Sequence, residues 1–259
     1  MALVNWQDLS FEVIDGPTLP ALANVALDQV LCERTGSGDR GPTLRFWRWD
    51  DPVIVMGSYQ SVQNEVNEDT ALDAGFKVTR RISGGGTMFM NPEHCITYSL
   101  IVPTALVAGM SFRESYEFLD RWVMQALADL GIKARYVPIN DIASDNGKIA
   151  GAAQRRMVTG VTLHHVTMAY DIDSDLMHRC MRIGAEAISK RGVRSAVKHV
   201  DPLRSQTDLP RNAIINAFKE KFINLYNAKV GHLTEGEVVS ALSLAHSRFA
   251  DPEWVHRVP

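Results

Sequence analysis

Apolar and polar residues alternate along several short stretches of the chain, which is the spacing of half-buried β-strands. In residues 76–79, for example, Phe76 and Val78 alternate with two polar residues. The Asn146-Gly147 pair is a hairpin signal that places Lys148 just after a turn. The pattern predicts eight strands, at residues 44–48, 53–56, 78–82, 95–102, 135–137, 142–144, 148–156 and 161–170.

Four longer stretches repeat apolar residues every three to four positions, as amphipathic helices do. Ser111 is the expected N-cap of one helix, and Gly131 is its expected stop. Thr234 and Glu237 form a capping-box pattern at the start of another. The predicted helices cover residues 19–33, 111–130, 213–226 and 234–249.

This order of elements predicts an α+β protein with mixed or antiparallel sheets flanked by helices. The sequence contains no internal repeat, low-complexity tract or long linker. We therefore expect one domain over residues 1–259, in which residues 205–259 form a small helical cap.

The composition is that of a compact globular protein, since 46% of the 259 residues are hydrophobic and can form an ample core. A net charge of −3 argues against a nucleic-acid-binding protein. No apolar run approaches the roughly 20 residues that span a bilayer, and residues 1–10 lack the basic and apolar regions of a secretory signal. We expect a soluble, cytoplasmic protein that binds neither nucleic acid nor membrane.

Three cysteines, Cys32, Cys95 and Cys180, are too few and too scattered for a disulfide framework or a zinc cluster. We expect reduced thiols, with Cys95 a small buried side chain of an apolar strand.

His164 and His165 are adjacent in a predicted strand, where neighbouring side chains point to opposite faces, so we assign them no metal.

A glycine triplet follows the strand predicted at 78–82, in the segment Arg80-Arg81-Ile82-Ser83-Gly84-Gly85-Gly86-Thr87. Glycine enters positive φ freely, so successive backbone N–H groups can point into one concavity and a phosphate or carboxylate can approach closely. The two arginines add fork-shaped cationic donors. This segment predicts one half of an anion site.

The other half lies downstream, in Asn140-Asp141 and the run Gly147-Lys148-Ile149-Ala150-Gly151-Ala152. A lysine between two glycines is held near crowded backbone, where its ammonium can neutralise phosphate charge that develops in a reaction. Each signal alone is weak, because a glycine triplet is more often a tight turn and a lysine in a Gly-rich hairpin is usually solvated. The combination is a compound pattern that indicates a site.

These two segments resemble the signatures of the lipoate–protein ligases, which share a superfamily with the biotin ligases and the octanoyl transferases. The resemblance covers nearly the whole chain. Its other segments are Asn24-Val25-Ala26-Leu27-Asp28, similar to a first-helix signature; residues 51–60, similar to a strand and a Gly-x-x-Gln ligand loop; residues 191–197, similar to the segment that closes over the adenylate; and residues 248–254, similar to the end of the ligase catalytic domain.

The resemblance implies a biotin/lipoate ligase-like fold and an enzyme that uses ATP and Mg²⁺ to convert lipoate to lipoyl-AMP. The lipoyl group then passes to a lysine of a lipoyl-domain protein, such as the glycine cleavage H protein or a 2-oxoacid dehydrogenase E2. Lys148 is expected to contact the acyl carbonyl and phosphate oxygens, and Asp141 to hold Mg²⁺ on the nucleotide or to orient the incoming amine. The residues expected to bind lipoate or the adenylate are Arg80, Arg81, Ser83, Gly84, Gly85, Gly86, Thr87, Gly57, Tyr59, Gln60, Asn140, Gly151 and Ala152.

The chain departs from the ligase pattern in three places. Met90 and Asn91 stand where ligases usually carry His-Asp, in a segment that forms the nucleotide end of the pocket. Ser58 stands where ligases often carry arginine. The sequence ends at Pro259, so we expect the accessory domain of many ligases to be absent, and either a separate partner chain supplies it or the protein works without it.

Three alternatives remain open at this point. An octanoyl or lipoyl transferase with a thioester or acyl-protein donor needs a nucleophilic cysteine near Lys148. Residues 136–147 contain none, and the neighbours of Cys180 do not match a second such family. A non-catalytic lipoate-binding protein is disfavoured by the intact Lys148 and Asp141. A biotin ligase is disfavoured because its Gly-Arg-Gly-Arg-type loop is missing. The sequence does not separate lipoate from octanoate.

Overall fold

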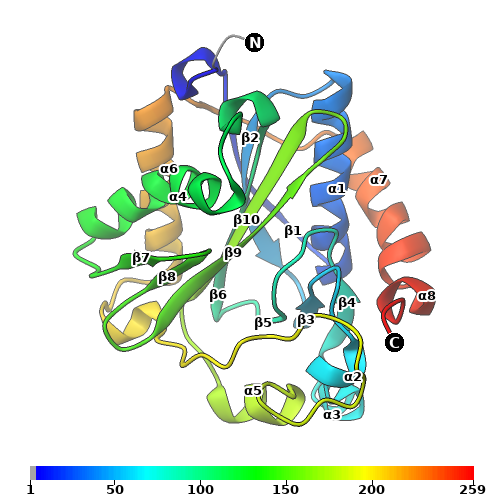
Figure 1. Ribbon diagram of the computed structural model, residues 1–259. Helices are drawn as coiled ribbons and strands as arrows, with labels where there is room; N and C mark the ends of the chain where they lie inside the picture. The colour runs from blue at the N-terminus through cyan, green and yellow to red at the C-terminus, as the bar shows by residue number, and fades with distance from the viewer. Residues whose placement is uncertain (1–3) are drawn as a thin grey trace.

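An eight-stranded mixed sheet forms the centre of the computed structural model, which describes residues 4–259 (Figure 1). Its β1 strand is parallel to both neighbours, and the remaining pairs are antiparallel. In spatial order the strands are β11 (Lys229–Val230), β1 (Glu12–Leu19), β2 (Thr43–Trp49), β6 (Cys95–Pro103), β10 (Val161–Ala169), β9 (Lys148–Arg156), β8 (Asp141–Ala143) and β7 (Arg135–Val137).

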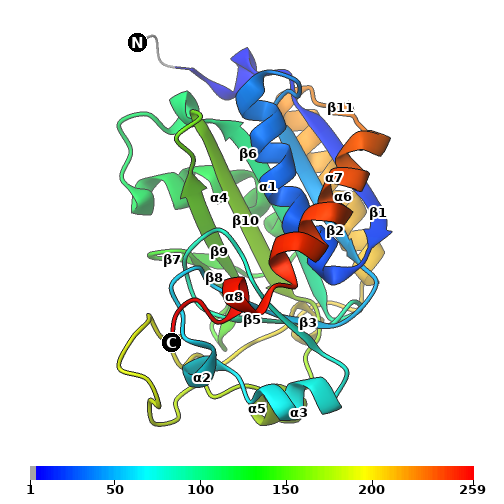
Figure 2. The same cartoon turned by 90° about the vertical axis from the view of Figure 1, so that its right-hand side faces the viewer.

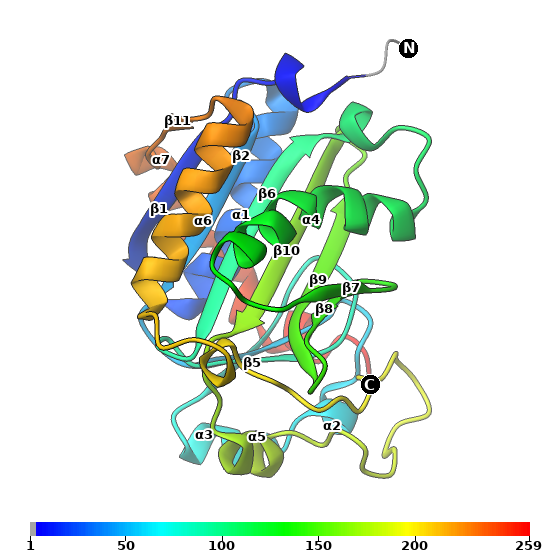
Figure 3. The ribbon, with the colours of Figure 1, turned by 90° about the vertical axis from the view of Figure 1, so that its left-hand side faces the viewer.

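Helices cover both faces of this sheet (Figures 2 and 3). On one face lie α4 (Phe112–Asp129) and α6 (Arg211–Tyr226), and on the other lie α1 (Ala21–Ser37) and α7 (Glu235–Leu244). Trp122 of α4 packs edge-on against Phe222 of α6, with ring centroids 5.1 Å apart. Residues 205–259, expected as a cap, are therefore divided between both faces and the β11 edge of this sheet, and residues 252–255 pack against a second sheet.

A second sheet of three strands lies below the first, in the order β4 (Lys77–Arg80), β3 (Val53–Met56) and β5 (Met88–Met90) (Figure 1). Its core includes Ile54, Met56 and Phe76. The short helices that pack around it are α2 (Val62–Glu65), α3 (Glu68–Asp73), α5 (Ser174–Cys180) and α8 (Pro252–Val255).

The predicted strands are all present, each within two residues at either end, and the predicted α+β class is confirmed. The predicted helix caps are confirmed as well. The Ser111 hydroxyl accepts a hydrogen bond from the Glu114 amide at 3.3 Å, and Thr234 forms a capping box with Glu237. Gly131 follows α4 with a φ of +72°. The predicted helix 234–249 is α7 continued by a π-helical turn, Ala245–Phe249.

The strand β1 was not predicted, and the helix expected to begin at residue 19 begins at Ala21. Gly16 and Pro17, which usually mark turns, lie inside β1. The register with β2 shifts between Asp15 and Thr18, so the irregularity falls at this pair. The short elements β5, β11, α2, α3, α5 and α8 were also not predicted. Within residues 4–259, no helix is both long and apolar enough to cross a membrane.

Candidate active site

A cavity of about 530 Å³ lies between the two sheets. Strands β6, β9 and β10 of the large sheet line one side, and the glycine loop with β5 lines the other. Residues 193–196, 198 and 200 contribute a further wall. This volume is within the usual range of sites for small organic ligands.

Lys148, the first residue of β9, forms an ion pair with Asp141, the first residue of β8. The distance from Lys148 Nζ to Asp141 Oδ1 is 3.0 Å, and the other carboxylate oxygen contacts Lys198. Asp141 is 4% exposed, whereas the Lys148 side chain retains 26% exposure toward the cavity. Burial lowers the pKa of Lys148, and the attraction of Asp141 opposes that shift. The structure thus brings together the two residues predicted to be catalytic.

Gly151 gives the Lys148 side chain its path across the strand. A Cβ at position 151 would lie 2.5 Å from Lys148 Nζ and 2.9 Å from its Cε, so any side chain there would push the ammonium away. The spacing Gly-Lys-x-x-Gly is therefore a packing requirement of the site. Gly151 lines the cavity, and its part in the site is to leave room for the Lys148 side chain.

The backbone of Lys148 is held by a segment far along the chain. Its N–H donates to the carbonyl of His199 at 2.8 Å, and its carbonyl accepts from the N–H of Asp201 at 2.9 Å. The Asp201 carboxylate in turn accepts from the Ser144 hydroxyl. These bonds fix the position of the lysine at the end of the β8–β9 turn, where the Asn146-Gly147 signal places it.

Arg81 organises the glycine loop from within the protein. Its guanidinium donates to the carbonyls of Gly84 at 2.5 Å and Gly86 at 2.9 Å, and to the Ser83 hydroxyl at 3.0 Å. Burial lowers the pKa of Arg81 to about 10, so it remains a cation at neutral pH. Within residues 4–259, no group accepts a hydrogen bond from the N–H of Gly85 or Gly86, both of which line the cavity. Backbone amides without an acceptor are groups that can bind an anion, which is the role predicted for this loop.

Arg80 points away from the cavity, which corrects the expectation that both arginines flank the ligand. Alternation along β4 sends its fully buried side chain to the opposite side. There it donates to the carbonyls of Gly57 at 2.9 Å and Val255 at 2.6 Å. Arg80 therefore fastens α8 to the Gly57 turn and has a structural role.

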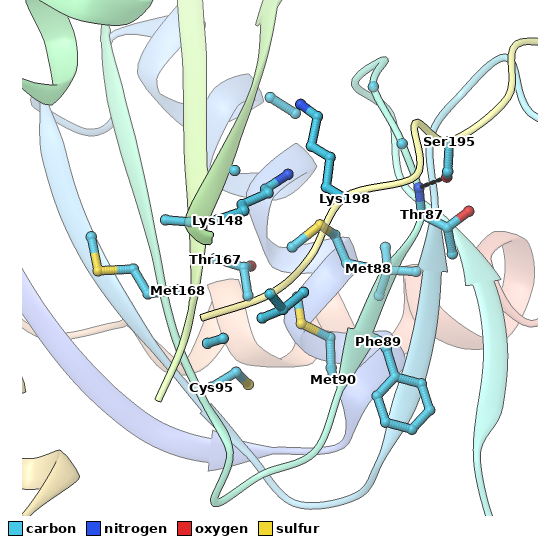
Figure 4. Close-up of a pocket in the computed structure, with 18 of the residues that line it drawn as sticks. Thr87, Met88, Phe89, Met90, Cys95, Lys148, Thr167, Met168, Ser195 and Lys198 are labelled. Carbon is cyan, nitrogen blue, oxygen red and sulfur yellow. Dashed lines mark hydrogen bonds between the residues drawn. The ribbon is translucent and has the colours of Figure 1, made fainter. Parts of the chain in front are cut away.

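A latch formed by Gln60, Glu65, Thr87 and Ser195 closes residues 193–195 over the glycine loop. The Ser195 hydroxyl accepts from the Thr87 N–H at 2.9 Å and from the Gln60 amide at 3.0 Å. The Ser195 N–H donates to the Glu65 carboxylate at 3.0 Å. Figure 4 shows Ser195 beside Thr87 at this point. The segment expected to close over an adenylate is thus docked on the loop expected to bind it.

A buried network of polar side chains, which includes Asp28 of α1, supports the glycine loop. The Ser83 hydroxyl lies 2.6 Å from His165 Nε2, and His165 Nδ1 lies 2.8 Å from the Asp28 carboxylate. Arg45 also pairs with Asp28, at 3.0 Å. Burial lowers the pKa of His165, so its imidazole is neutral. His164 points to the opposite face and pairs with Asp120, as alternation along β10 predicts.

The family profile of the Lipoyl protein ligase A/B catalytic domain matches residues 20–224 of the chain. The chain belongs to this family. Octanoyltransferase LipM of Symbiobacterium thermophilum is 27% identical over 275 residues, covering 95% of this chain and 98% of its own. The chain is therefore an enzyme of the lipoate ligase and transferase family.

Two solved structures carry the same fold. A bi-partite lipoate protein ligase from Thermoplasma acidophilum, studied with its E2 lipoyl domain, has a TM-score of 0.79 and 22% identity, over 96% of each chain. A lipoate-protein ligase A with bound ATP has a TM-score of 0.77 and 22% identity, over 95% of this chain and 98% of its own. The predicted lipoate ligase-like fold is confirmed.

The predicted site residues of this Lipoyl protein ligase A/B domain fall into two groups. Those that line the cavity are Arg81, Gly85, Gly86, Thr87, Asn140, Asp141, Lys148, Gly151 and Ala152. Those outside its lining are Arg80, Ser83, Gly84, Gly57, Tyr59 and Gln60. In the second group Tyr59 is 65% exposed, while Gln60 is buried and acts through the latch. Apart from Arg80, which has a structural role, the binding roles of these residues remain predictions.

The lower part of the cavity is apolar and rich in sulfur (Figure 4). Met88, Met90 and Met168 line it together with Cys95, whose place in the cavity was not predicted. Cys95 is buried as expected, and burial raises its pKa to about 12. Its thiol donates to the Asn91 carbonyl at 3.2 Å. At neutral pH this cysteine is therefore a thiol and not a thiolate.

Asp141 is poorly suited to hold a metal ion, because its two oxygens already face Lys148 and Lys198. Within residues 4–259, no group of three or more His, Cys, Asp or Glu side chains is arranged to bind a metal. This geometry does not favour the expected coordination of Mg²⁺, and the other expected role of Asp141, orienting the incoming amine, stays a prediction. A magnesium ion would then enter with the nucleotide as part of the substrate.

Proposed function

We propose that the protein is a lipoate–protein ligase that activates lipoate with ATP and transfers the lipoyl group to a lysine of a lipoyl-domain protein. The observation that carries the proposal is that one cavity is lined by the Lys148–Asp141 pair, by Gly85 and Gly86, whose amides have no acceptor among residues 4–259, and by an apolar part. A medium-chain acid needs the apolar part, and the phosphate needs the amides and the ammonium.

In the first step a carboxylate oxygen of lipoate attacks the α-phosphorus of ATP. The bond from that phosphorus to the bridging oxygen breaks, and pyrophosphate leaves with the electron pair. Two anions must be brought together, so the step depends on donors fixed around them. Lys148 and the Gly85 and Gly86 amides supply these donors.

In the second step the neutral amine of the acceptor lysine attacks the acyl carbonyl carbon. The bond between that carbon and the phosphate oxygen breaks, AMP leaves with the electron pair, and the amine proton passes to water. Lys148 stabilises the negative charge that develops on the carbonyl and phosphate oxygens. Burial lowers the pKa of Lys148, and the carboxylate of Asp141, 3.0 Å away, favours its charged form.

The second candidate is an octanoyl transferase, which is favoured by the name of the S. thermophilum relative. Such an enzyme acting through a thioester needs a cysteine that ionises near neutral pH. Burial raises the pKa of Cys32, Cys95 and Cys180. Of these three cysteines, all within residues 4–259, only Cys95 lines the cavity. This chemistry supports the ATP-dependent ligase over the thioester transferase.

The deciding experiment supplies the purified protein with an apo-lipoyl domain, lipoate or octanoate, and Mg-ATP. Pyrophosphate release and the mass of the acceptor are followed together. A parallel reaction replaces acid and ATP with an octanoyl thioester of acyl carrier protein, and a Cys95→Ser variant is run in both.

We expect acid-dependent pyrophosphate release, an acylated acceptor, and unchanged activity in Cys95→Ser. Transfer from the thioester that disappears in Cys95→Ser, without any use of ATP, would establish the transferase. Binding of lipoate with no product in either reaction would indicate a non-catalytic protein. A third reaction supplies lipoyl-AMP in place of acid and ATP; transfer there, with no pyrophosphate release in the first reaction, would indicate a partner chain for activation.

A further inference from the structure

Lys198 lies at the site but was not predicted there. The segment that the sequence analysis singled out, residues 191–197, ends one residue before it. Its ammonium contacts the carboxylate oxygen of Asp141 that Lys148 does not occupy. Its side chain is 41% exposed and lines the cavity. Figure 4 shows the two lysines in the same part of the cavity, above the methionines. Two cations from distant parts of the chain thus share one carboxylate.

The backbone on both sides of Lys198 is fixed. On the N-terminal side Ser195 is held by Thr87, Gln60 and Glu65. On the C-terminal side His199 bonds to the backbone of Lys148. A lysine on a mobile loop would lose much conformational entropy on binding a ligand. The backbone of Lys198 is already ordered, so its share of that entropy cost is smaller.

The charges at the site do not balance, because Asp141 carries one negative charge and faces two ammonium groups. A nearly buried carboxylate with two lysines leaves one positive charge among these three groups, and the Arg81 guanidinium, which also lines the cavity, adds a second. A phosphate diester carries one negative charge and would offset one of these positive charges. Lys198, the more exposed of the two lysines, is the one that can turn from Asp141 to a ligand.

We propose that Lys198 is a phosphate-binding residue of this site, and that it moves from Asp141 to the phosphate of the nucleotide when substrate binds. The inference rests on the proposed function and adds a second cation to it. Lys148 stays on Asp141, at the 3.0 Å distance that the structure shows. Its role is to stabilise the α-phosphate during attack by the carboxylate, without taking or giving a proton.

The test compares Lys198→Met, Lys198→Arg and Lys190→Met. Methionine keeps the unbranched stem of lysine and removes the charge, whereas arginine keeps the charge. Lys190 is an exposed lysine of the same segment that does not line the cavity, so Lys190→Met is the matched control. The measurements are kcat and KM for Mg-ATP in acid-dependent pyrophosphate release, and the KM for lipoate.

We expect Lys198→Met to lower kcat/KM for Mg-ATP about 10²-fold, which is typical for loss of one charge-stabilising donor. The KM for lipoate should change less than about threefold, because its acyl chain occupies the apolar part. Lys198→Arg should recover at least a tenth of the activity, and Lys190→Met should match the wild type. A Lys198→Met enzyme with wild-type kcat/KM for Mg-ATP would overturn the inference, as would an effect confined to lipoate. Absence of pyrophosphate release in the wild type would instead overturn the proposed function.

Discussion

The carbonyl group of Gly85 packs directly on the Cα of Gly57. A Cβ on Gly57 would overlap with the Gly85 oxygen and would lie 2.9 Å from its carbonyl carbon. Both atoms belong to backbone, so neither can turn aside as a side chain would. The turn after β3 therefore sets the position of the glycine loop, although Gly57 itself does not line the cavity.

Gly57→Ala should displace the glycine loop and lower acyl transfer by about 10²-fold, the usual effect of a shift of about 1 Å in a catalytic group. The fold should survive, because the displaced loop lies at the cavity and not in the core. Activity and melting temperature are measured together. Gly236→Ala is the matched control, since a Cβ there meets nothing within 4 Å and alanine favours the helix α7. Full activity of Gly57→Ala would show that the loop does not need this contact.

Lys148→Ala should reduce acyl transfer at least about 10³-fold, because it removes the donor to both the carbonyl and the phosphate oxygens. Thermal unfolding should change little, since the side chain lies in the cavity and not in a hydrophobic core. Lys229→Ala, at an exposed lysine of β11, serves as the control. Retained activity in a folded Lys148→Ala protein would contradict the proposed mechanism.

Arg80 and Arg81 are adjacent in sequence and should respond differently to substitution. Arg80→Ala leaves the carbonyls of Gly57, Trp254 and Val255 without their donor, which should cost on the order of 3 kcal/mol in the free energy of unfolding. At a temperature where the variant is still folded, its kcat/KM should stay within about tenfold of wild type. Urea unfolding and steady-state kinetics on the same samples measure the two effects.

Arg81→Ala should instead abolish measurable acyl transfer, because the carbonyls of Gly84 and Gly86 lose the group that orients them. Arg81→Lys should not restore it, since an ammonium cannot present the planar fork that reaches both oxygens and Ser83. An active Arg81→Lys enzyme would mean that charge alone is sufficient at this position.

The free energy of unfolding should depend on pH through His165. Burial lowers the pKa of this residue below its ordinary value of 6.5. The unfolded chain therefore takes up the proton first as pH falls, and the stability that is complete above about pH 6.5 is lost below it, by at most about 1.4 kcal/mol per pH unit. Urea unfolding at pH 7.5 and pH 5.5 measures the change. His165→Gln should show a smaller difference between the two pH values, and an equal difference would assign the effect to other groups.

Sequence patterns were sufficient for the strands and helices with regular spacing. The strand β1 was missed because Gly16 and Pro17 interrupt its local pattern, while its pairing with β2 and β11 depends on residues elsewhere in the chain. Pairing of this kind is a property of the whole fold, and local propensity does not report it.

The same distinction applies to the site. Lys148, Asp141 and the glycine loop were predicted because each belongs to a compact motif. Lys198 and Cys95 were not predicted, because only the three-dimensional fold brings them to the cavity. Arg80 ends β4 and Arg81 follows it, so their side chains point to opposite sides, but the sequence does not say which side meets the cavity.

The ammonium groups of Lys148 and Lys198, which share the single carboxylate of Asp141, attract any phosphate group, including that of the product AMP. Under the proposed function, AMP must leave the cavity against the attraction of Lys148, Lys198 and the Gly85 and Gly86 amides. Departure of the product, and not the making of the amide bond, would then limit the rate of repeated turnovers. A first turnover faster than those that follow, with a later rate that rises with ionic strength, is the kinetic behaviour expected of this unequal count of charges.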